Sequence, residues 1–150
     1  MSAHQPVIPQ PAATVVLVRE RNEDLEVFLT RRHRAMAFLG GFYVFPGGKV
    51  EAQDLACAAV DRVQGLEAAL AGRILGLAPD RALAHWIAAI RETFEETAIL
   101  LARGSDGAAH ARPIDARLRE LRRALHEGEI DFAALLGRLG LTADAKALYY

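Results

Sequence analysis

Hydrophobic positions in the first third of the chain follow the short periods of β-strands. Residues 14–18 form a β-branched run that predicts a buried strand. Residues 25–30 alternate in a strand-like way and predict a second strand. The charged segment 19–24 between the two strands predicts a turn, so we expect a hairpin with a longer loop. An aromatic run at 42–45 predicts a third strand. It ends at Pro46-Gly47-Gly48, through which we expect no regular strand or helix to continue.

From residue 55 onward the apolar period becomes helical. Residues 55–72 are rich in alanine and leucine and predict a helix with a break near Gly65. A second break follows at 76–79. Asp80 is then the expected N-cap of the longest helix in the chain, which we expect to continue to about Arg103.

The last third is predicted to be mainly helical. Residues 104–107 predict a loop, and residues 114–126 predict an amphipathic helix with a leucine-rich stripe. Residues 131–139 predict a short helix stopped by Gly140, and only residues 147–150 resemble the start of a strand. Strands followed by helices predict an α/β fold of the α+β type.

Composition places the chain among globular domains without a membrane or nucleic-acid signature. Its 150 residues fit one domain, for which we assign 13–150 after a flexible leader at 1–12. The 18 basic and 19 acidic residues nearly balance, which argues against binding to nucleic acid or to an anionic membrane. The leader lacks the pattern of a signal peptide, and Cys57 is the single cysteine, so we expect a cytoplasmic protein. A homo-oligomer is compatible with this composition.

The long predicted helix carries three carboxylates on one side. Glu92, Glu95 and Glu96 follow the i, i+3, i+4 spacing of one helix face. The opposite side is apolar and contains Ile87, Ile90, Phe94, Ala98 and Leu101. Like charges at this spacing cost a helix about 0.2–0.5 kcal/mol per pair, and a bound Mg²⁺ or Mn²⁺ would remove the repulsion. The alternative is a solvated acidic face in which Arg91 pairs with Glu95 one turn away.

A glycine turn upstream provides a second candidate element. The sequence Phe-Pro-Gly-Gly at 45–48 is followed by Lys-Val-Glu and then by Asp54. Two glycines let a backbone approach a metal or a phosphate closely, and they leave the carbonyl of Gly47 free to act as a ligand. The alternative is an ordinary tight turn after a strand.

Together these two elements resemble the Nudix box. That box has a glycine, five residues, a glutamate, seven residues and then Arg-Glu-apolar-any-Glu-Glu-any-Gly-apolar. Here Gly48 precedes Asp54 by five residues, and Arg91 begins Arg-Glu-Thr-Phe-Glu-Glu-Thr-Ala-Ile. Asp54 replaces the glutamate and Ala98 replaces the second glycine. In addition, 36 residues rather than seven separate Asp54 from Arg91, an excess of 29. We assign 55–86 as a helical insertion, such as a coenzyme A diphosphatase-like subgroup of the family carries.

The segment before the glycine turn is similar to the signature of coenzyme A-hydrolysing members. Leu-Thr-Arg-Arg at 29–32 leads through a glycine to the Phe-Pro-Gly-Gly sequence, although the signature expects a further arginine where Ala37 stands. Arg31, Arg32 and Arg34 are therefore candidates to bind substrate phosphates. The alternative is a strand end with exposed basic residues. A later basic run is expected to form only a solvated face, and it contains Arg117, Arg119, Arg122 and Arg123.

The resemblance implies a metal-dependent diphosphatase that acts on a nucleotide-type small molecule, with coenzyme A or acyl-CoA as one substrate class. It implies an α/β/α sandwich around a mixed sheet. Glu92, Glu95, Glu96 and the Gly47 carbonyl would bind Mg²⁺ or Mn²⁺, and Gly48 would lie against the substrate. Arg91 would position the glutamates, and Glu92 would also orient or deprotonate water. Asp54 would support the turn into the helix.

Two other readings of this chain remain open. In the resemblance, several strands follow the glutamate helix, whereas this sequence offers mostly helices there. We therefore expect a C-terminally truncated domain with an incomplete sheet and an exposed edge. A non-catalytic Nudix-like nucleotide-binding or regulatory module, or an inactive fragment, would also fit. An interaction domain with an incidental acidic helix is the third possibility.

Overall fold

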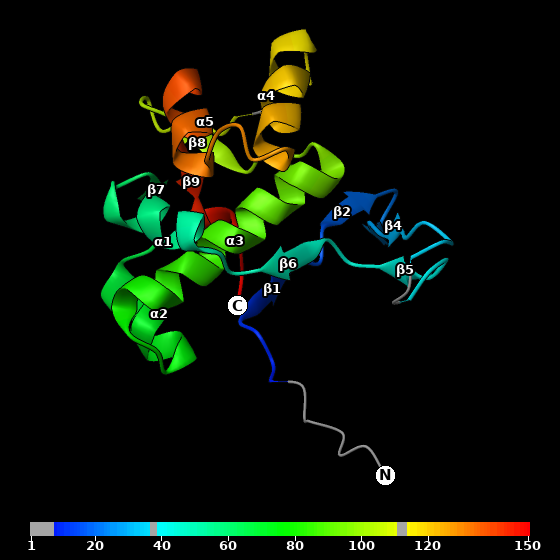
Figure 1. The fold of residues 1–150 in the computed structure, drawn as a ribbon, viewed down its shortest axis with the longest axis horizontal. Helices are drawn as coiled ribbons and strands as arrows, with labels where there is room; N and C mark the ends of the chain where they lie inside the picture. The colour runs from blue at the N-terminus through cyan, green and yellow to red at the C-terminus, as the bar shows by residue number, and fades with distance from the viewer. Residues whose placement is uncertain (1–7, 37–38, 111–113) are drawn as a thin grey trace.

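The computed structural model describes residues 8–36, 39–110 and 114–150, and it has an α+β architecture. A long helix, α3 (Pro79–Thr97), lies at the centre. The N-terminal strands lie on one side of it in Figure 1, and α4 and α5 lie above it. The predicted fold class is therefore confirmed, although the described strands form several small sheets and not one large one.

Six short strands precede the first helix and form three antiparallel pairs, β1 with β6, β2 with β3 and β4 with β5. They are β1 (Ala12–Thr14), β2 (Val18–Arg21), β3 (Asp24–Val27), β4 (Thr30–Arg31), β5 (Tyr43–Val44) and β6 (Gly47–Lys49). The β2–β3 pair confirms a hairpin in this region, but β2 lies mostly within the predicted turn at 19–24. The chain turns tightly at Asn22 and Glu23, which both have positive φ. The predicted strand at 14–18 is divided between β1, which ends at Thr14, and β2, which begins at Val18. Val15 still donates its N–H to the Pro46 carbonyl.

The predicted third strand ends before Pro46, as β5, but Gly47 begins a new strand, which corrects the expectation that no strand would continue through 46–48. Gly47 and Gly48 belong to β6 and pair with Thr14 and Ala13 of β1. Gly47 has a φ of +155°, and a Cβ at this position would overlap the carbonyl oxygen of Ala13. Glycine thus permits a closer approach of two backbones than other residues would, and the proline lies before the paired residues.

The five described α-helices agree with the predicted ones except at several ends. They are α1 (Ala52–Ala59), α2 (Ala68–Leu75), α3, α4 (Ala116–His126) and α5 (Phe132–Leu139). Asp80 is not the N-cap of α3, because Ala78 holds that place and Pro79 fills the first helical position. The helix ends at Thr97 and not near Arg103, since Ala98 adopts a left-handed conformation with φ of 64°.

A three-stranded mixed sheet joins distant parts of the chain, and the sequence analysis missed most of it. It contains β7 (Val63–Gln64), β9 (Leu141–Asp144) and β8 (Ala102–Gly104), in that order. Strand β9 is parallel to β7 and antiparallel to β8. The expected strand start at 147–150 was wrong, because residues 145–147 form a 3₁₀ turn. Strands of two to four residues are too short to show a period.

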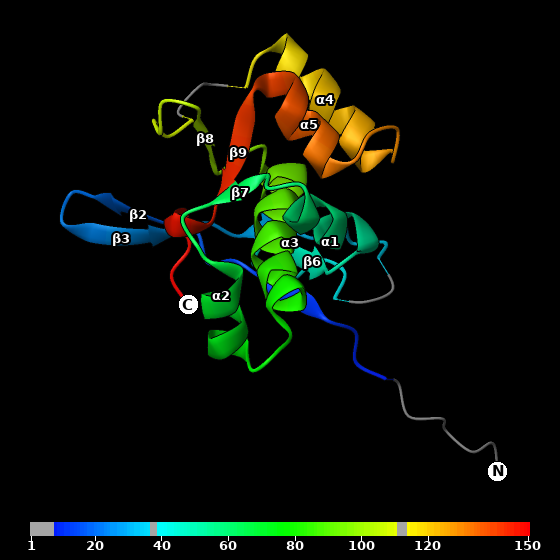
Figure 2. The same cartoon turned by 90° about the vertical axis from the view of Figure 1, so that its left-hand side faces the viewer.

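The core surrounds α3. Its Ile87, Ile90 and Phe94 are fully buried, as is Phe132 of α5. In the second view α4 and α5 lie over one end of α3 while α1 and α2 flank it (Figure 2), and both α1 and α2 pack against α3. Of the predicted apolar stripe, Ala98 and Leu101 lie beyond the end of the helix.

The segment 55–86 therefore packs on the core and does not project from it. It contains most of α1, all of β7 and α2, and the first part of α3. The expected break near Gly65 is confirmed, and β7 occupies it. That this segment is an insertion relative to related proteins stays a prediction.

A buried ion pair connects α1 to α3 within this core. Arg91 Nε donates to Asp54 Oδ1 at 2.8 Å and Arg91 Nη2 donates to Asp54 Oδ2 at 3.0 Å. The exposed fractions of the two side chains are 2 % and 0 %. Asp54 Oδ2 also accepts the N–H of Glu51 at 2.8 Å, which caps the start of α1. The two charges are thus desolvated together and satisfied by each other.

Removing one partner of this pair should lower the free energy of unfolding of the domain by a large amount. Asp54→Ala leaves a buried guanidinium without its main counter-charge, so we expect a loss of about 3–5 kcal/mol in the free energy of unfolding. Fluorescence of Trp86, the single tryptophan, provides the signal for denaturant titrations. Glu26→Ala is the control, because Glu26 pairs with Arg19 and Arg21 on the surface. Equal losses in both variants would contradict a stabilising role of the buried pair.

Candidate functional site

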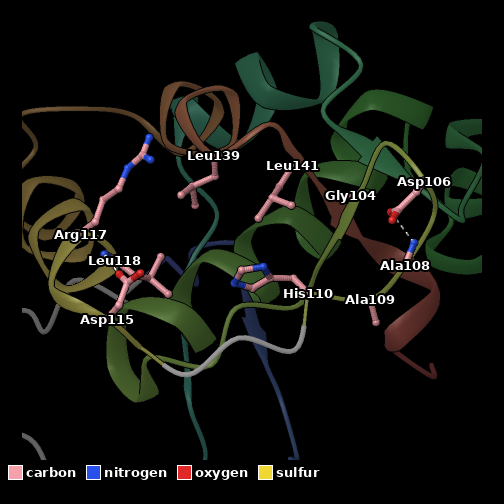
Figure 3. A pocket seen from close by; sticks show the side chains of 10 residues that line it. All are labelled: Gly104, Asp106, Ala108, Ala109, His110, Asp115, Arg117, Leu118, Leu139 and Leu141. Atoms are coloured by element: carbon pink, nitrogen blue, oxygen red, sulfur yellow. Dashed lines mark hydrogen bonds between the residues drawn. The ribbon is translucent and has the colours of Figure 1, made fainter.

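The prominent hollows on the surface lie away from the three glutamates. One hollow of about 480 Å³ lies between β8, β9 and the start of α4, and its lining includes His110 and Asp115 (Figure 3). Another, of about 740 Å³, lies between residues 12–18, Trp86 and residues 147–150. None of the glutamates of α3 lines either hollow. The candidate catalytic residues are therefore identified by their contacts with one another, because they line neither of these hollows.

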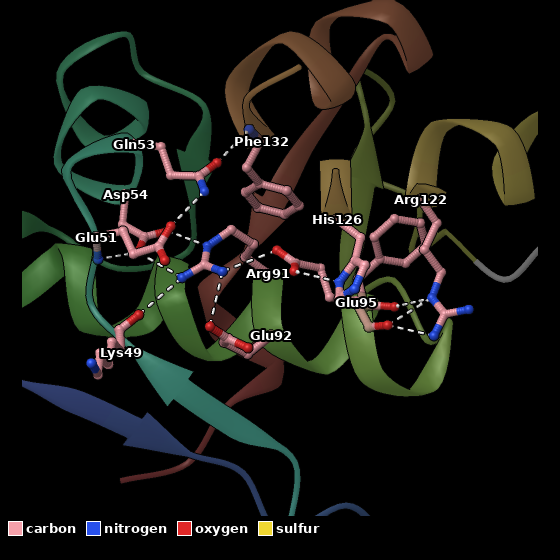
Figure 4. Close-up of polar contacts among 11 residues, drawn as sticks. Lys49, Glu51, Gln53, Asp54, Arg91, Glu92, Glu95, Arg122, His126 and Phe132 are labelled. Carbon is pink, nitrogen blue, oxygen red and sulfur yellow. Dashed lines mark hydrogen bonds and ion pairs between the residues drawn. The ribbon is translucent and has the colours of Figure 1, made fainter. Parts of the chain in front are cut away.

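Arg91 uses every N–H of its guanidinium group. Nε and Nη2 each donate one hydrogen bond to Asp54, and Nη2 also donates to the Lys49 carbonyl at 3.0 Å. Nη1 donates to Glu92 Oε1 at 2.9 Å and to Glu95 Oε1 at 3.0 Å (Figure 4). Burial alone would lower the pKa of Arg91, but the hydrogen bonds to Asp54 and Glu95 outweigh burial and raise it. The guanidinium thus stays charged and fixes carboxylates on both of its sides.

Glu92 lies between Arg91 and the glycine strand β6. Its carboxylate is so close to Gly48 that a Cβ there would lie 2.6 Å from Oε2 and closer still to Oε1. Partial burial raises the pKa of Glu92, and the neighbouring Glu95 and Glu96 raise it further, while Arg91 opposes the shift. The Glu92 carboxylate can therefore occupy this position only because residue 48 has no side chain.

Glu96 faces the same strand from the next position on the helix face. The N–H of Gly47 donates to Glu96 Oε2 at 3.3 Å, and the side chain is otherwise exposed. The fold thus brings the glycine turn and the glutamate helix together, although more than 40 residues separate them in the sequence. Their common position agrees with what the resemblance to the Nudix box implied.

The donor set fits a hard divalent cation in chemistry, although it is not gathered around one point. Within the described ranges, no three carboxylate, histidine or cysteine side chains converge as a metal site would require. Arg91 draws Glu92 and Glu95 toward itself, whereas Glu96 turns to Gly47. Each glutamate keeps one carboxylate oxygen outside these hydrogen bonds, and the glycine backbone leaves room beside Glu92. Oxygen ligands of this kind suit Mg²⁺ or Mn²⁺.

Two residues of α4 reach the same helix, and sequence reasoning missed both. Arg122 donates to the carbonyl oxygens of Phe94 and Glu95, and His126 Nδ1 lies 3.8 Å from Glu95 Oε2 (Figure 4). The expectation that the basic run forms only a solvated face is thus wrong for Arg122. No signal in one sequence pairs an amphipathic helix with a particular carbonyl, because the partner is set by how the helices pack.

The arginines expected to bind phosphate lie elsewhere. Arg31 is in β4, where its Nε donates to the Gly41 carbonyl at 3.3 Å and its guanidinium lies 5.6 Å from the centre of the Tyr43 ring. Arg32 and Arg34 follow on the same hairpin, which lies beyond β6 and away from α3 in Figure 1. The fold does not bring these arginines to the glutamates, and Ala37 lies outside the described residues.

Comparison with known proteins gives one informative similarity. No protein-family model matches the chain, and no curated protein sequence matches it. Among solved structures, the chain is similar to a NUDIX hydrolase from Alicyclobacillus acidocaldarius, with 32 % identity and a TM-score of 0.72. The match covers 91 % of this chain but 57 % of that protein, so the chain spans little more than half of its length.

The described helices include none that is long and apolar enough to cross a membrane. The match to the solved structure extends over most of this chain. The chain therefore has a Nudix-type fold.

Proposed function

We propose that this chain carries the metal-binding residues of a hydrolase that cleaves a diphosphate linkage in a nucleotide-type substrate. The observation that carries the proposal is the clamp of Arg91, which holds Glu92 and Glu95 beside the Gly47–Gly48 strand. The similarity to a NUDIX hydrolase supports the reaction class. The activity of the whole protein remains part of the proposal, since the chain spans 57 % of that structure.

Glu92, Glu95, Glu96 and the Gly47 carbonyl would hold Mg²⁺ or Mn²⁺. When bound, such an ion neutralises phosphate charge and lowers the pKa of a coordinated water. Arg91 fixes two of these glutamates through Nη1, and Asp54 fixes Arg91 in turn. The protein's own part is to keep the carboxylates oriented before substrate arrives, which lowers the cost of assembling the site.

Glu92 is the residue we assign to proton transfer from water. Its burial raises its pKa, so its carboxylate accepts a proton more readily than an exposed glutamate does. Glu96 is the more exposed of the three and is better suited to ligation at the solvent side. This division of roles follows from their different surroundings on one helix face.

Coenzyme A or acyl-CoA is the substrate class that the sequence before the glycine turn favours. Arg31, Arg32 and Arg34 would bind substrate phosphates from the β4–β5 hairpin, and Gly48 would lie against the diphosphate. Because the hairpin lies away from α3, such contacts require a substrate long enough to extend along β6. A molecule with several phosphates at separate positions meets this requirement.

A non-catalytic nucleotide-binding module is the second candidate. It is favoured by the carboxylates of Glu92 and Glu95, which Arg91 already engages and which do not converge on one point. Such a module would bind a nucleotide diphosphate without releasing products. Turnover distinguishes the two candidates.

Glu92→Gln should abolish most turnover without unfolding the chain. The amide cannot accept the proton, so we expect kcat/KM for a nucleotide diphosphate with Mn²⁺ to fall by about 10²–10⁴-fold. Product release from coenzyme A and a panel of nucleotide diphosphates, with and without chelator, is the measurement. Glu129→Gln is the control, because Glu129 is exposed and, among the described residues, its ion pair is to Arg123. Wild-type turnover that is unaffected by chelator would rule out the metal-dependent reaction.

Gly48→Ala should weaken metal binding more than it weakens folding. The new Cβ would displace the end of the Glu92 side chain, while Asp54, Glu95 and the Lys49 carbonyl would still hold Arg91 in the core. We expect Mn²⁺ affinity, measured by the paramagnetic signal of free Mn²⁺, to fall roughly tenfold or more. Gly137→Ala is the control, since a Cβ there meets only Arg62, at 3.5 Å. Unchanged affinity in Gly48→Ala would exclude Glu92 as a ligand in its present position.

A further inference from the structure

The C-terminal end of α3 carries negative charge that no residue of its last turn neutralises. The three glutamates lie in its last two turns, where the helix dipole disfavours negative charge. The last turn contains no basic residue. The last carbonyl groups of any helix also lack partners from the helix. A cation from another element would therefore stabilise this end on both counts.

Arg122 of α4 provides that cation. Its Nε donates to the Phe94 carbonyl at 3.0 Å and to the Glu95 carbonyl at 2.8 Å, and its Nη2 also donates to Glu95. The Phe94 oxygen already accepts the N–H of Ala98 at 2.9 Å. The N–H of Ile99, which would continue the helical pattern to the Glu95 oxygen, donates instead to Thr97 Oγ1 at 3.1 Å. Arg122 thus takes the place of the missing backbone donor at Glu95.

We propose that Arg122 is a positioning residue for the glutamate site, acting through the backbone of Glu95. This inference rests on the proposed function. Two arginines then hold Glu95 from two elements: Arg91 binds its carboxylate and Arg122 binds its carbonyl. His126, one turn further along α4, approaches the other carboxylate oxygen at 3.8 Å. Helix α4 lies outside the motif that carries the glutamates, and it binds the last carbonyl groups of α3.

The forked guanidinium is essential to this role. A planar group with donors on Nε and Nη2 can bind two successive carbonyls at once, whereas the lysine ammonium is a point charge on a flexible stem. Arg122→Lys would keep the charge at the helix end but lose the fixed geometry. Comparing the two variants separates the effect of charge from the effect of positioning.

The test measures Mn²⁺ affinity and amide hydrogen exchange in the same set of variants. For Arg122→Ala we expect Mn²⁺ affinity to fall roughly tenfold to 100-fold. In the metal-free protein we expect faster exchange at Ala98 and Ile99. Arg122→Lys should recover part of the affinity. Arg123→Ala is the control, because Arg123 lies on the same helix and its ion pairs with described residues are to Glu127 and Glu129. This variant should match the wild type in both measurements.

Each outcome decides one proposal. Wild-type Mn²⁺ affinity in Arg122→Ala, or equal loss in Arg123→Ala, would overturn the positioning role and leave the proposed function standing. A wild-type chain that binds no Mn²⁺ would overturn the proposed function and the positioning role with it. If Arg122→Ala does not fold, Arg122→Lys decides: reduced affinity at an unchanged thermal midpoint supports the positioning role, and unchanged affinity overturns it.

Discussion

The buried pair of Arg91 and Asp54 is the interaction on which the rest of this structure depends. A charged guanidinium inside a core is unfavourable unless all of its donors are satisfied, and Arg91 satisfies them with one aspartate, two glutamates and one backbone carbonyl. The same group therefore holds α1 against α3, fixes the end of β6 and orients the carboxylates. Folding and the candidate chemistry share one residue, so they cannot be varied independently at this position.

Besides α1, which supplies Asp54, two elements from distant parts of the sequence contact α3 near this pair. Strand β6 approaches Glu92 and Glu96 through backbone that has no side chains at Gly47 and Gly48. Helix α4 approaches the helix end through Arg122. Placing negative side chains at the negative end of a helix dipole is costly, and the two arginines offset that cost from opposite sides. The site is thus assembled against the local preference of its own helix, which is common where function requires it.

Much of the site could be predicted because it is local. The i, i+3, i+4 spacing alone puts Glu92, Glu95 and Glu96 on one helix face, and Arg91 at i−4 from Glu95 predicts their pairing. The spacing of Gly48 from Asp54 also matched a known motif, despite the 36 residues that separate Asp54 from Arg91. Three predictions failed because they depend on contacts between distant residues. They were that no strand includes Gly47, that α3 extends to Arg103, and that Arg122 is solvated. In each case the deciding partner, namely β1, β9 or α3, is far away in the sequence.

The sequence by itself determined the helices, the β2–β3 hairpin, the acidic face and the residues that carry the candidate chemistry, because periodicity and side-chain chemistry act over a few residues. Only the tertiary structure decided that the Asp54 carboxylate is shared between the start of α1 and Arg91. It also decided that β7, β8 and β9 form a mixed sheet, and that the arginines of β4 lie away from α3. These features depend on which apolar surfaces pack against each other and become buried from water. That pairing is a property of the folded chain as a whole.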